Sequence, residues 1–519
     1  MTTPALARSP RRWWALVALT LSVLITGLDG TIINVALPTL ARELGADSAQ
    51  LQWIGGGYLL ALSVTMLPIG LLGDRYGHKR LLSSGTALFG VASVAGALVG
   101  STGAVIAVRA ALGVGAAMIM PLSMAIMPRI FAPEELPKAI ATWTAATAVG
   151  LPAGPVVGGW LLDHFWWGSI FLFNVPVAAL ALVACLWLLP RDPARDRART
   201  PFDALGTVLS AVGITSLVYG TILVPRQGWG SPPVLTTLVA GAALLALFVR
   251  RQRGHAHPLV DLGLFADRRF RWGTLIAVFV NFAVMGVLFV VPQYLEAVLG
   301  NDAFGTGLRV LPLIGGLMTA AALSEALLPR LGFRVVIPVG LAVLATGALL
   351  GARTGSGDGY GSAVVWLGLC GLGFGLAVVP STSLVMSSLP ADSPGAGTSL
   401  LETVQQVGGV LGVAGLGSLL SAGYLARLTV TGLPAPAAEA ARDSVSAADT
   451  VAGQLHAPGL LASAHGAFIH GMTLVLLVCG LISLLAAAFA AVRLPGRTKD
   501  TEPAREMAVQ LPEPGESPA

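Results

Sequence analysis

The sequence predicts an all-α polytopic membrane protein with fourteen transmembrane helices. Fourteen times the chain runs apolar for about 20 residues, the length that a helix needs to cross ~30 Å of hydrocarbon. Hydrophobic residues make up 55% of the 519 residues and charged residues 11%, against ~25% charged residues in an ordinary soluble domain. A span has to be helical, because lipid satisfies no backbone hydrogen bond. We therefore expect the working residues to lie in the bilayer as well.

The apolar stretches divide the chain into two groups of six spans with a pair between them. We expect the spans at 13–38, 51–73, 81–100, 104–127, 139–162, 168–189, 203–224, 234–250, 272–295, 305–328, 335–352, 361–386, 394–421 and 467–493. The expected parts are a cytoplasmic tail (1–12), a six-helix bundle (13–190), a cytoplasmic linker (191–202), a two-helix insert (203–251), a cytoplasmic loop (252–271), a second six-helix bundle (272–493) and a disordered cytoplasmic tail (494–519). The second bundle contains an extracellular loop at 422–466, in which we expect one short helix at 436–451.

The Lys and Arg side chains indicate the orientation. If the N-terminus is cytoplasmic and the spans alternate, inner loops and tails hold 24 of the 31 cations, outer loops hold six, and Arg109 falls inside a span. Cytoplasmic loops carry such an excess. The distribution favours both termini in the cytoplasm of a cell-membrane protein. The net charge of +5 does not indicate nucleic-acid binding, because no basic stripe with interleaved aromatic residues exists, and no metal-ligand spacing appears.

Ionisable residues inside the expected spans are the first functional candidates, because each costs at least ~2.5–3.5 kcal/mol on insertion scales. They are Asp29, Arg109, Glu296, Glu325 and Glu402. Burial and a neighbouring cation act in opposite directions on the proton affinity of a carboxyl group, so Asp29 and Glu402 are candidates for proton coupling. The alternative for Asp29 is a static salt bridge or hydrogen bond to a neighbouring span. Arg109 is expected to tune a carboxylate, because a guanidinium does not deprotonate in proteins.

A second set of residues is expected to line a cavity for substrate or protons. Gln405 and Gln406 follow Glu402 at i+3 and i+4 and form one polar helix face with it. Asn34, Glu325 and Glu296 complete this set. The alternative for Glu325 is an interfacial pair with the nearby Arg330, and the alternative for Glu296 is contact with the outer headgroups.

The short loop between the second and third spans is a candidate gating latch. Its candidate residues are Gly70, Gly73, Asp74, Arg75, Gly77, Lys79 and Arg80. A charge run in such a place is usually a topological anchor, whereas an acid among cations on a Gly-bracketed loop suits a contact that breaks and re-forms. The pattern at 74–79 returns in part at 329–334, which suggests an internal duplication like that of many secondary transporters.

The fifth span is rich in small residues. Gly150, Gly154 and Gly158 share one helix face, which permits close approach of another helix. Pro152 and Pro155 remove backbone donors and are expected to bend the helix, and Gly159 ends the run. Two interpretations are open: packing alone, or a kinked helix against which the other half of the protein slides.

Together these motifs resemble the major facilitator superfamily, and within it the fourteen-span drug:proton antiporter branch. Residues 70–80 are similar to the superfamily's loop signature, 109–115 to its fourth-span signature, 150–159 to the antiporter signature, and 28–38 to the first-span motif of the branch. The resemblance implies a gating latch, proton transfer at Asp29 and Arg109, and export rather than import. His78 stands where an Arg is usual, and Glu296 where Gln is more frequent.

The sequence thus predicts a proton-coupled antiporter that exports small hydrophobic drugs or antibiotics, with cationic cargo as one option. Alternating access between two six-helix bundles would move the cargo, the proton gradient would drive it without a cofactor, and the chain would work as a monomer in the lipid bilayer. One alternative is an importer or symporter of a small metabolite. A membrane enzyme would need paired catalytic groups in a polar loop, and a sensor would need a soluble output domain; neither feature is found in the sequence.

Overall fold

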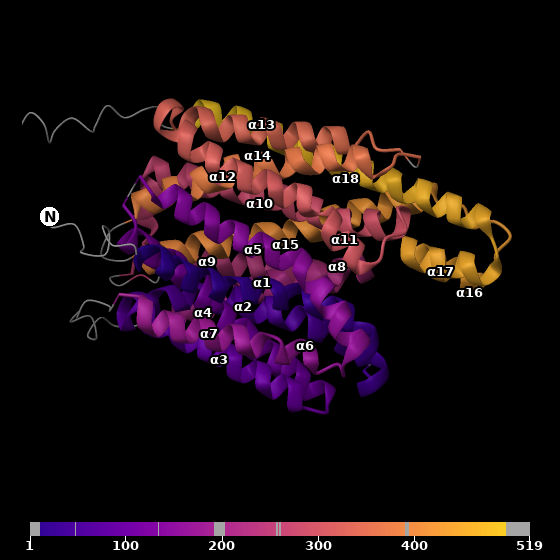
Figure 1. The fold of residues 1–519 in the computed structure, drawn as a ribbon, viewed down its shortest axis with the longest axis horizontal. Coiled ribbons are helices and arrows are strands. Elements are labelled where there is room, and N and C mark those ends of the chain that lie inside the picture. Colours follow the sequence, from indigo (N-terminus) through magenta and orange to yellow (C-terminus); the bar gives the residue numbers. More distant parts are fainter. Residues whose placement is uncertain are drawn as a thin grey trace, which may run out of the picture.

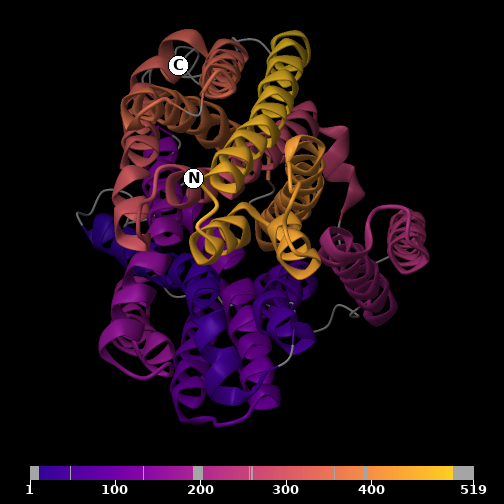
Figure 2. The same cartoon turned by 90° about the vertical axis from the view of Figure 1, so that its right-hand side faces the viewer.

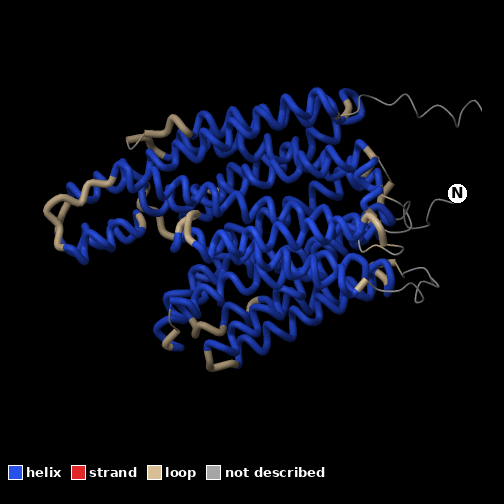
Figure 3. Tube along the Cα trace, turned by 180° about the vertical axis from the view of Figure 1, so that it is seen from behind, coloured by secondary structure: helices blue, strands red, loops and turns tan. Residues whose placement is uncertain are grey.

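The computed structural model describes residues 11–46, 48–132, 134–190, 203–255, 258, 261–355, 357–389 and 394–494. The whole expected linker (191–202) and nearly all of the two expected tails lie outside these ranges. Within the described ranges the chain is helical, and loops rather than strands connect the helices (Figure 3).

The helices form two groups with a pair between them in sequence. The first group is α1 (Arg11–Leu44), α2 (Ser48–Tyr76), α3 (His78–Leu98), α4 (Thr102–Ile130), α5 (Leu136–His164), α6 (Ser169–Leu172) and α7 (Asn174–Leu188). The pair is α8 (Ala204–Gln227) and α9 (Pro232–Gln252). The second group is α10 (Arg268–Gln293), α11 (Ala303–Arg309), α12 (Leu311–Leu331), α13 (Phe333–Gly351), α14 (Tyr360–Ser388), α15 (Pro394–Arg427), α16 (Ala435–Asp443), α17 (Val445–Leu455) and α18 (Pro458–Arg493).

The two groups lie side by side with their long helices roughly parallel (Figures 1 and 2). Helices α2 and α4 of the first group contact α15 of the second, and α5 contacts α12 and α14. The pair α8–α9 lies at one side, where α8 packs against both α2 and α15 (Figure 2). Helix α8 therefore lies over one seam between the two groups.

Successive long helices run in opposite directions, so the molecule has two distinct ends (Figure 1). We call the end at which α1 begins and α18 finishes the Arg11 end, and the opposite one the α16–α17 end. The expected loop 422–466 is largely helical: α15 continues to Arg427, α18 begins at Pro458, and α16 and α17 replace the single expected helix. The break between them comes at Ser444, whose Oγ accepts a hydrogen bond from Ala447 N at 3.2 Å and so caps α17.

Two glycines make matching turns in the two groups. Gly77 joins α2 to α3 with φ 101°, and Gly332 joins α12 to α13 with φ 74°. These positive φ angles favour glycine, because a Cβ is disfavoured there. The two residues occupy equivalent places in the repeated sequence pattern, which agrees with the suggested duplication.

Apolar side chains cover the outside of the molecule as well as its interior. Trp187 is 84% exposed and Leu98 80% exposed, as expected for helices that face lipid. Among the described residues, 12 helical segments are long and apolar enough to cross a membrane, rather than the expected fourteen. The two other expected spans, 139–162 and 203–224, lie in α5 and α8. The described apolar part of α8 is only Leu205–Thr221, and α5 is not among the 12 segments.

Candidate functional site

A buried polar cluster lies inside the first group of helices, around Asp29 of α1. The carboxylate accepts a hydrogen bond from Arg109 Nη1 of α4 at 2.5 Å and one from Asn174 Nδ2 of α7 at 2.9 Å. Asp29 and Arg109 are both 0% exposed, and Asn174 is 1% exposed. The two candidates from the sequence are thus brought together. Their ion pair joins α1 to α4, and the hydrogen bond from Asn174 adds α7.

The guanidinium of Arg109 has two further neighbours on α2. Its Nε donates to the carbonyl oxygen of Ile54 at 3.1 Å, and the ring of Tyr58 lies 4.5 Å from the guanidinium carbon. A cation over an aromatic face is attracted by the ring quadrupole. Tyr58 is itself held by a hydrogen bond from its hydroxyl to the carbonyl oxygen of Thr26, at 3.1 Å.

This cluster can change its charge only at a high electrostatic cost. Arg109 Nη2 and Asn174 Oδ1 are buried without a hydrogen-bond partner among the described residues. Removing one partner of a buried pair leaves an uncompensated charge, which costs about 3–5 kcal/mol. Protonation of Asp29 would have this effect on Arg109.

Sequence reasoning did not assign Asn174 or Tyr58 to this cluster. Nothing in the sequence places either residue beside Asp29, which lies 145 positions away from Asn174. The available signal was polarity: an Asn at the start of an apolar helix needs a partner once it is buried.

The expected latch connects the two groups at the Arg11 end. Asp74, at the end of α2, accepts hydrogen bonds from the backbone N–H groups of Gly395 (2.9 Å) and Ala396 (2.8 Å) in the first turn of α15. A carboxylate is favourable there, because the N-terminus of a helix carries unpaired N–H groups and a partial positive charge. His78 Nε2 lies 3.1 Å from Asp74 Oδ1, and its Nδ1 lies 3.3 Å from Arg129 Nη1.

The backbone approach at this latch is close. A Cβ added to Gly395 of α15 would lie 2.6 Å from the carbonyl oxygen of Gly70 of α2, so both helices need a glycine at this contact. Gly73 is in similarly tight contact with the side chain of Leu122. Asp74 is 8% exposed. The two groups therefore close against each other at the Arg11 end.

The cations of the latch loop have other positions. Lys79 Nζ donates to the carbonyl oxygens of Leu186 and Leu189, both at 2.7 Å, and so closes the end of α7 within the first group. Arg75 lies over the ring of Tyr76 at 5.4 Å, and Arg80 is exposed. The hydrogen bonds of Asp74 to the start of α15 are the contacts by which this loop crosses the seam.

A second contact crosses the seam at the same end. Glu325 of α12 pairs with Lys138 of α5 at 3.5 Å, and both side chains are 49% exposed. The expected alternative partner, Arg330, is not its ion-pair partner. Such exposed pairs contribute about 0–1 kcal/mol. Glu325 lies half-exposed at the surface in this arrangement, and its role in a substrate or proton cavity stays a prediction.

The glycine face of α5 packs against α1. A Cβ on Gly150 would lie 3.0 Å from Leu28 N, one on Gly154 would lie 2.7 Å from Leu28 O, and one on Gly158 would lie 2.7 Å from the side chain of Ile32. Gly159, on another face, has open space around it. The packing interpretation is therefore confirmed. This glycine face points to the same half of the protein, while α5 also contacts α12 and α14 of the other half, and the sliding interpretation stays a prediction. Pro155 lies within a continuous α5, and the side chain of Pro152 lies outside the described residues.

Glu402 is buried in α15, with 7% exposure, and its carboxyl group forms no hydrogen bond or ion pair with another described residue. The backbone oxygen of Gln405 accepts a hydrogen bond from Asn281 Nδ2 of α10 at 2.6 Å. Gln406, one turn beyond Glu402, lines a cavity. The expected polar face is therefore partly formed: Gln406 is in the cavity wall, and Glu402 lies one turn nearer the Arg11 end.

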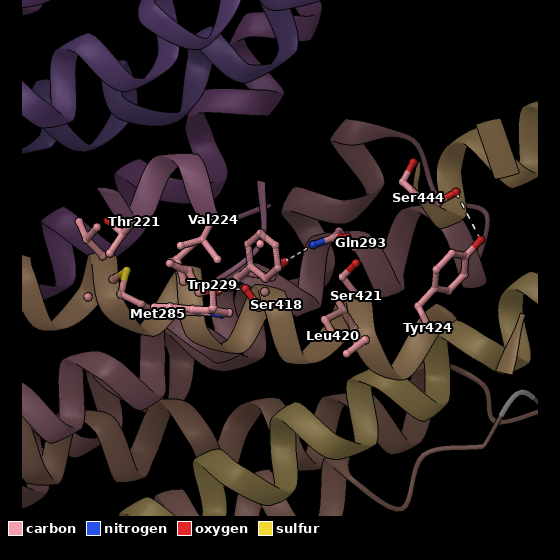
Figure 4. A pocket seen from close by; sticks show the side chains of 18 of the residues that line it. Thr221, Val224, Trp229, Met285, Gln293, Ser418, Leu420, Ser421, Tyr424 and Ser444 are labelled. Carbon is pink, nitrogen blue, oxygen red and sulfur yellow. Dashed lines mark hydrogen bonds between the residues drawn. The ribbon is translucent and has the colours of Figure 1, made fainter. Parts of the chain in front are cut away.

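The cavity has a volume of about 700 Å³ and lies toward the α16–α17 end (Figure 4). Six parts of the chain line it: α2 at Leu59, the end of α8 with the loop that follows it, one face each of α10 and α15, the segment between α16 and α17, and α18 at Phe468. Glu296 is exposed on the π-helical turn after α10 and is not among the residues that line this cavity, so its expected role in a cavity stays a prediction. The side chain of Asn34 lies outside the described residues.

Helix α2 links the three features. Tyr58 belongs to the buried cluster, its neighbour Leu59 lines the cavity, and Asp74, at the far end of the same helix, forms the latch. A movement of α2 would therefore displace residues of the buried cluster, the cavity wall and the latch together.

The pair α8–α9 is clamped at the Arg11 end by Asp203. Its carboxylate accepts hydrogen bonds from Gly206 N (2.8 Å), Arg251 Nη2 (3.0 Å) and Gln252 Nε2 (2.9 Å). Burial opposes ionisation of this group, but the hydrogen bonds from Gly206, Arg251 and Gln252 and the charge of Arg251 hold the pKa of Asp203 below its ordinary value.

Comparison with known proteins places this geometry in a family. The family model described as "Major Facilitator Superfamily" matches residues 19–413. The chain is 36% identical over 411 residues to the tetracenomycin C resistance and export protein of Streptomyces glaucescens, covering 79% of this chain and 76% of the relative. It is 34% identical over 399 residues to the multidrug resistance protein Stp of Mycobacterium tuberculosis, covering 76% and 74%.

Solved structures share the fold at low sequence identity. The proton:xylose symporter XylE superposes with a TM-score of 0.60 at 15% identity, covering 93% of this chain and 96% of that one. The human organic anion transporter MFSD10 superposes with a TM-score of 0.59 at 14% identity, covering 93% and 100%. With a family model over most of its length and relatives above 30% identity, this multi-pass membrane protein belongs to the Major Facilitator Superfamily.

Proposed function

We propose that this chain is a fourteen-span, proton-coupled antiporter that exports small hydrophobic compounds across the cytoplasmic membrane. The relatives that support this carry the names of resistance and export proteins, at 33% to 36% identity. The fourteen spans are the 12 apolar segments together with α5 and α8, which run between the same two ends of the molecule (Figure 1).

The Arg11 end faces the cytoplasm in this proposal. The positive-inside distribution supports it, because the loops and tails that the sequence assigns to the cytoplasmic side hold 24 Lys and Arg residues against six on the other side. Asp74 then closes the cytoplasmic side, and the cavity at the α16–α17 end is accessible from outside. The described arrangement corresponds to the stage at which cargo leaves and a proton enters.

The observation that carries the proposal is the buried Asp29–Arg109 pair in contact with α2. A proton on Asp29 removes the charge that faces Arg109, so the guanidinium loses its counter-ion and α1, α2 and α4 shift to compensate. Through α2 this shift reaches both the cavity wall at Leu59 and the Asp74 latch. Loss of the latch opens the cytoplasmic side, where the proton is released and cargo binds.

The driving force is sufficient for export. An inward proton releases ~2.3 kcal/mol per 100 mV of membrane potential and ~1.4 kcal/mol per pH unit. Each 1.4 kcal/mol corresponds to a tenfold concentration ratio.

The test compares Asp29→Asn and Glu402→Gln with the intact protein in an efflux-deficient bacterium, on a panel of antibiotics and dyes. Asp163→Asn is the matched control, because Asp163 is an exposed carboxylate at one end of α5. We expect the intact protein and Asp163→Asn to confer resistance, and Asp29→Asn to confer none at equal protein levels. Glu402→Gln is expected to reduce resistance.

Inverted membrane vesicles provide the second readout. We expect an imposed pH gradient to drive uptake of a protective compound into vesicles with intact protein and not with Asp29→Asn. Full resistance from both variants, or uptake that ignores the gradient, would show that the coupling assignment is incorrect. Accumulation of the compound in intact cells would favour the import alternative.

A further inference from the structure

The cavity at the α16–α17 end has an unusual charge composition for a site in which cationic cargo is an option. Among the described residues that line its volume of about 700 Å³, Asp443 is the only one with a charged side chain, and it is exposed. Glu402 and Asp29 do not line it. A cation that left water for this cavity would lose hydration without gaining a buried counter-ion, which is unfavourable.

The polar groups of the wall point to a ligand with hydrogen-bond donors at its edge. Asn281 Nδ2 donates to the carbonyl oxygen of Gln405 at 2.6 Å, and Gln293 Nε2 donates to that of Phe289 at 2.8 Å. Since a carbonyl oxygen only accepts, each amide must turn its nitrogen to that partner, and its oxygen remains as the acceptor. Two amide oxygens, three turns apart on α10, are thus available to hydroxyl or N–H groups.

The apolar part of the wall is aromatic and comes in part from the α8–α9 pair. Gly228 has φ 76° and ends α8, and the next residue, Trp229, lines the cavity while 42% exposed. Helix α8 is held in place by stacking of Tyr219 on Trp53 of α2, with ring centroids 5.8 Å apart. Phe289 and Phe468 add aromatic surface from the second group (Figure 4 shows the surrounding side chains). A flat apolar ligand gains most from such a wall.

We propose that this cavity binds an uncharged, flat, polycyclic aromatic compound with hydroxyl groups at its edge, and that Trp229 and the amide oxygen of Gln293 position it. The volume lies within the range of about 300–1,000 Å³ for sites of drug-sized ligands. The inference rests on the proposed export function and names the class of cargo. It also gives the α8–α9 pair a role, because part of the binding surface is missing without it.

Equilibrium dialysis of the purified full-length protein in lipid nanodiscs tests the proposal, with empty nanodiscs as the blank for partitioning into lipid. The probes at pH 6 are 2,6-dihydroxyanthraquinone, unsubstituted anthraquinone and the permanent cation tetraphenylphosphonium. We expect the intact protein to bind the dihydroxy compound at least tenfold more tightly than the cation. Ser421→Trp, which fills the cavity, and Trp229→Ala should each weaken that binding at least tenfold. Trp187→Ala, on the 84% exposed Trp187 of α7, should leave it unchanged.

Gln293→Leu separates hydrogen bonding from folding and shape. We expect it to weaken binding of the dihydroxy compound about tenfold and to leave binding of unsubstituted anthraquinone unchanged. Unaltered binding in Ser421→Trp, equal or tighter binding of tetraphenylphosphonium, or no binding of the dihydroxy compound would overturn the proposal.

Vesicle transport distinguishes this failure from failure of the proposed function. If proton-driven uptake sensitive to Asp29→Asn persists while cavity-filling variants bind and transport normally, the site is wrong and the function stands. If the dihydroxy compound binds as expected but no uptake responds to a pH gradient, the function is wrong and the site stands.

Discussion

The Asp74 latch allows a quantitative prediction. Gly395 N donates to Oδ1 of Asp74 and Ala396 N to Oδ2, so Asp74→Asn keeps the shape of the side chain but removes its negative charge and replaces one of the two acceptor oxygens with an NH2 group. A hydrogen bond to a charged group contributes about 1.5–3 kcal/mol and a neutral one about 0.5–1.5 kcal/mol. The bond that remains becomes neutral and loses about 1 kcal/mol, and the other bond is lost at a cost of about 2 kcal/mol. Closure at the Arg11 end therefore weakens by ~3 kcal/mol, which is about a 150-fold increase in the open population.

Thiol labelling measures this population. The three native cysteines, Cys185, Cys370 and Cys479, are all buried. Ser399 of α15 is 0% exposed, and its Oγ is the atom nearest to a Cβ placed on Gly70 across the seam. A Ser399→Cys variant is therefore labelled by N-ethylmaleimide only when the Arg11 end opens.

We expect Asp74→Asn in this background to accelerate labelling about 150-fold, and Asp163→Asn to leave it unchanged. The native cysteines must remain unlabelled in a protein with Ser399 intact. An unchanged rate in Asp74→Asn would refute the reasoning, because it would mean that the charge of Asp74 does not stabilise the closed arrangement.

Three further predictions concern stability and the seam. Gly154→Ala should lower the melting temperature and the yield of folded protein, because the added Cβ meets Leu28 O at 2.7 Å and overpacking costs about 1–3 kcal/mol. Gly159→Ala is the control, because Gly159 has open space around it. Equal stability of the two variants would contradict the packing account. Asp203→Asn should lower the melting temperature at pH 7. The pKa of Asp203 is lowered in the folded protein, so its ionised form stabilises the folded state above the unfolded pKa of about 3.9. This contribution is lost as the pH falls through the pKa of the folded state. The difference between Asp203→Asn and the intact protein should therefore close in melting curves below about pH 4, and a difference independent of pH would argue against the charge. Glu325→Gln should change Ser399→Cys labelling less than threefold, because its pair with Lys138 is half exposed; a change as large as that of Asp74→Asn would show that this surface pair is a major part of the closure.

Local chemistry made several site residues predictable. A carboxylate and an Arg in apolar spans have to find partners, and Asp29 and Arg109 do so with each other. The acid in the Gly-bracketed loop also has the expected cross-seam role at Asp74. In both cases the cost of burying charge is so high that the presence of the residue already implies a contact.

Partner identity was not predictable in the same way. Glu325 pairs with Lys138 rather than Arg330, and the glycine face of α5 meets α1 rather than the other half. Sequence spacing shows which residues share a helix face, but not which helix that face meets. The choice among neighbouring helices depends on packing of the whole bundle.

The sequence by itself determined that this is a helical membrane protein with its functional charges inside the bilayer, because hydropathy and the cost of buried charge act residue by residue. The tertiary structure decided that Asn174 and Tyr58 complete the Asp29 cluster, that α2 joins this cluster to the latch and the cavity, and that α8 supplies part of the cavity wall. These are contacts between residues far apart in the chain, and only the packing of helices against one another brings them together.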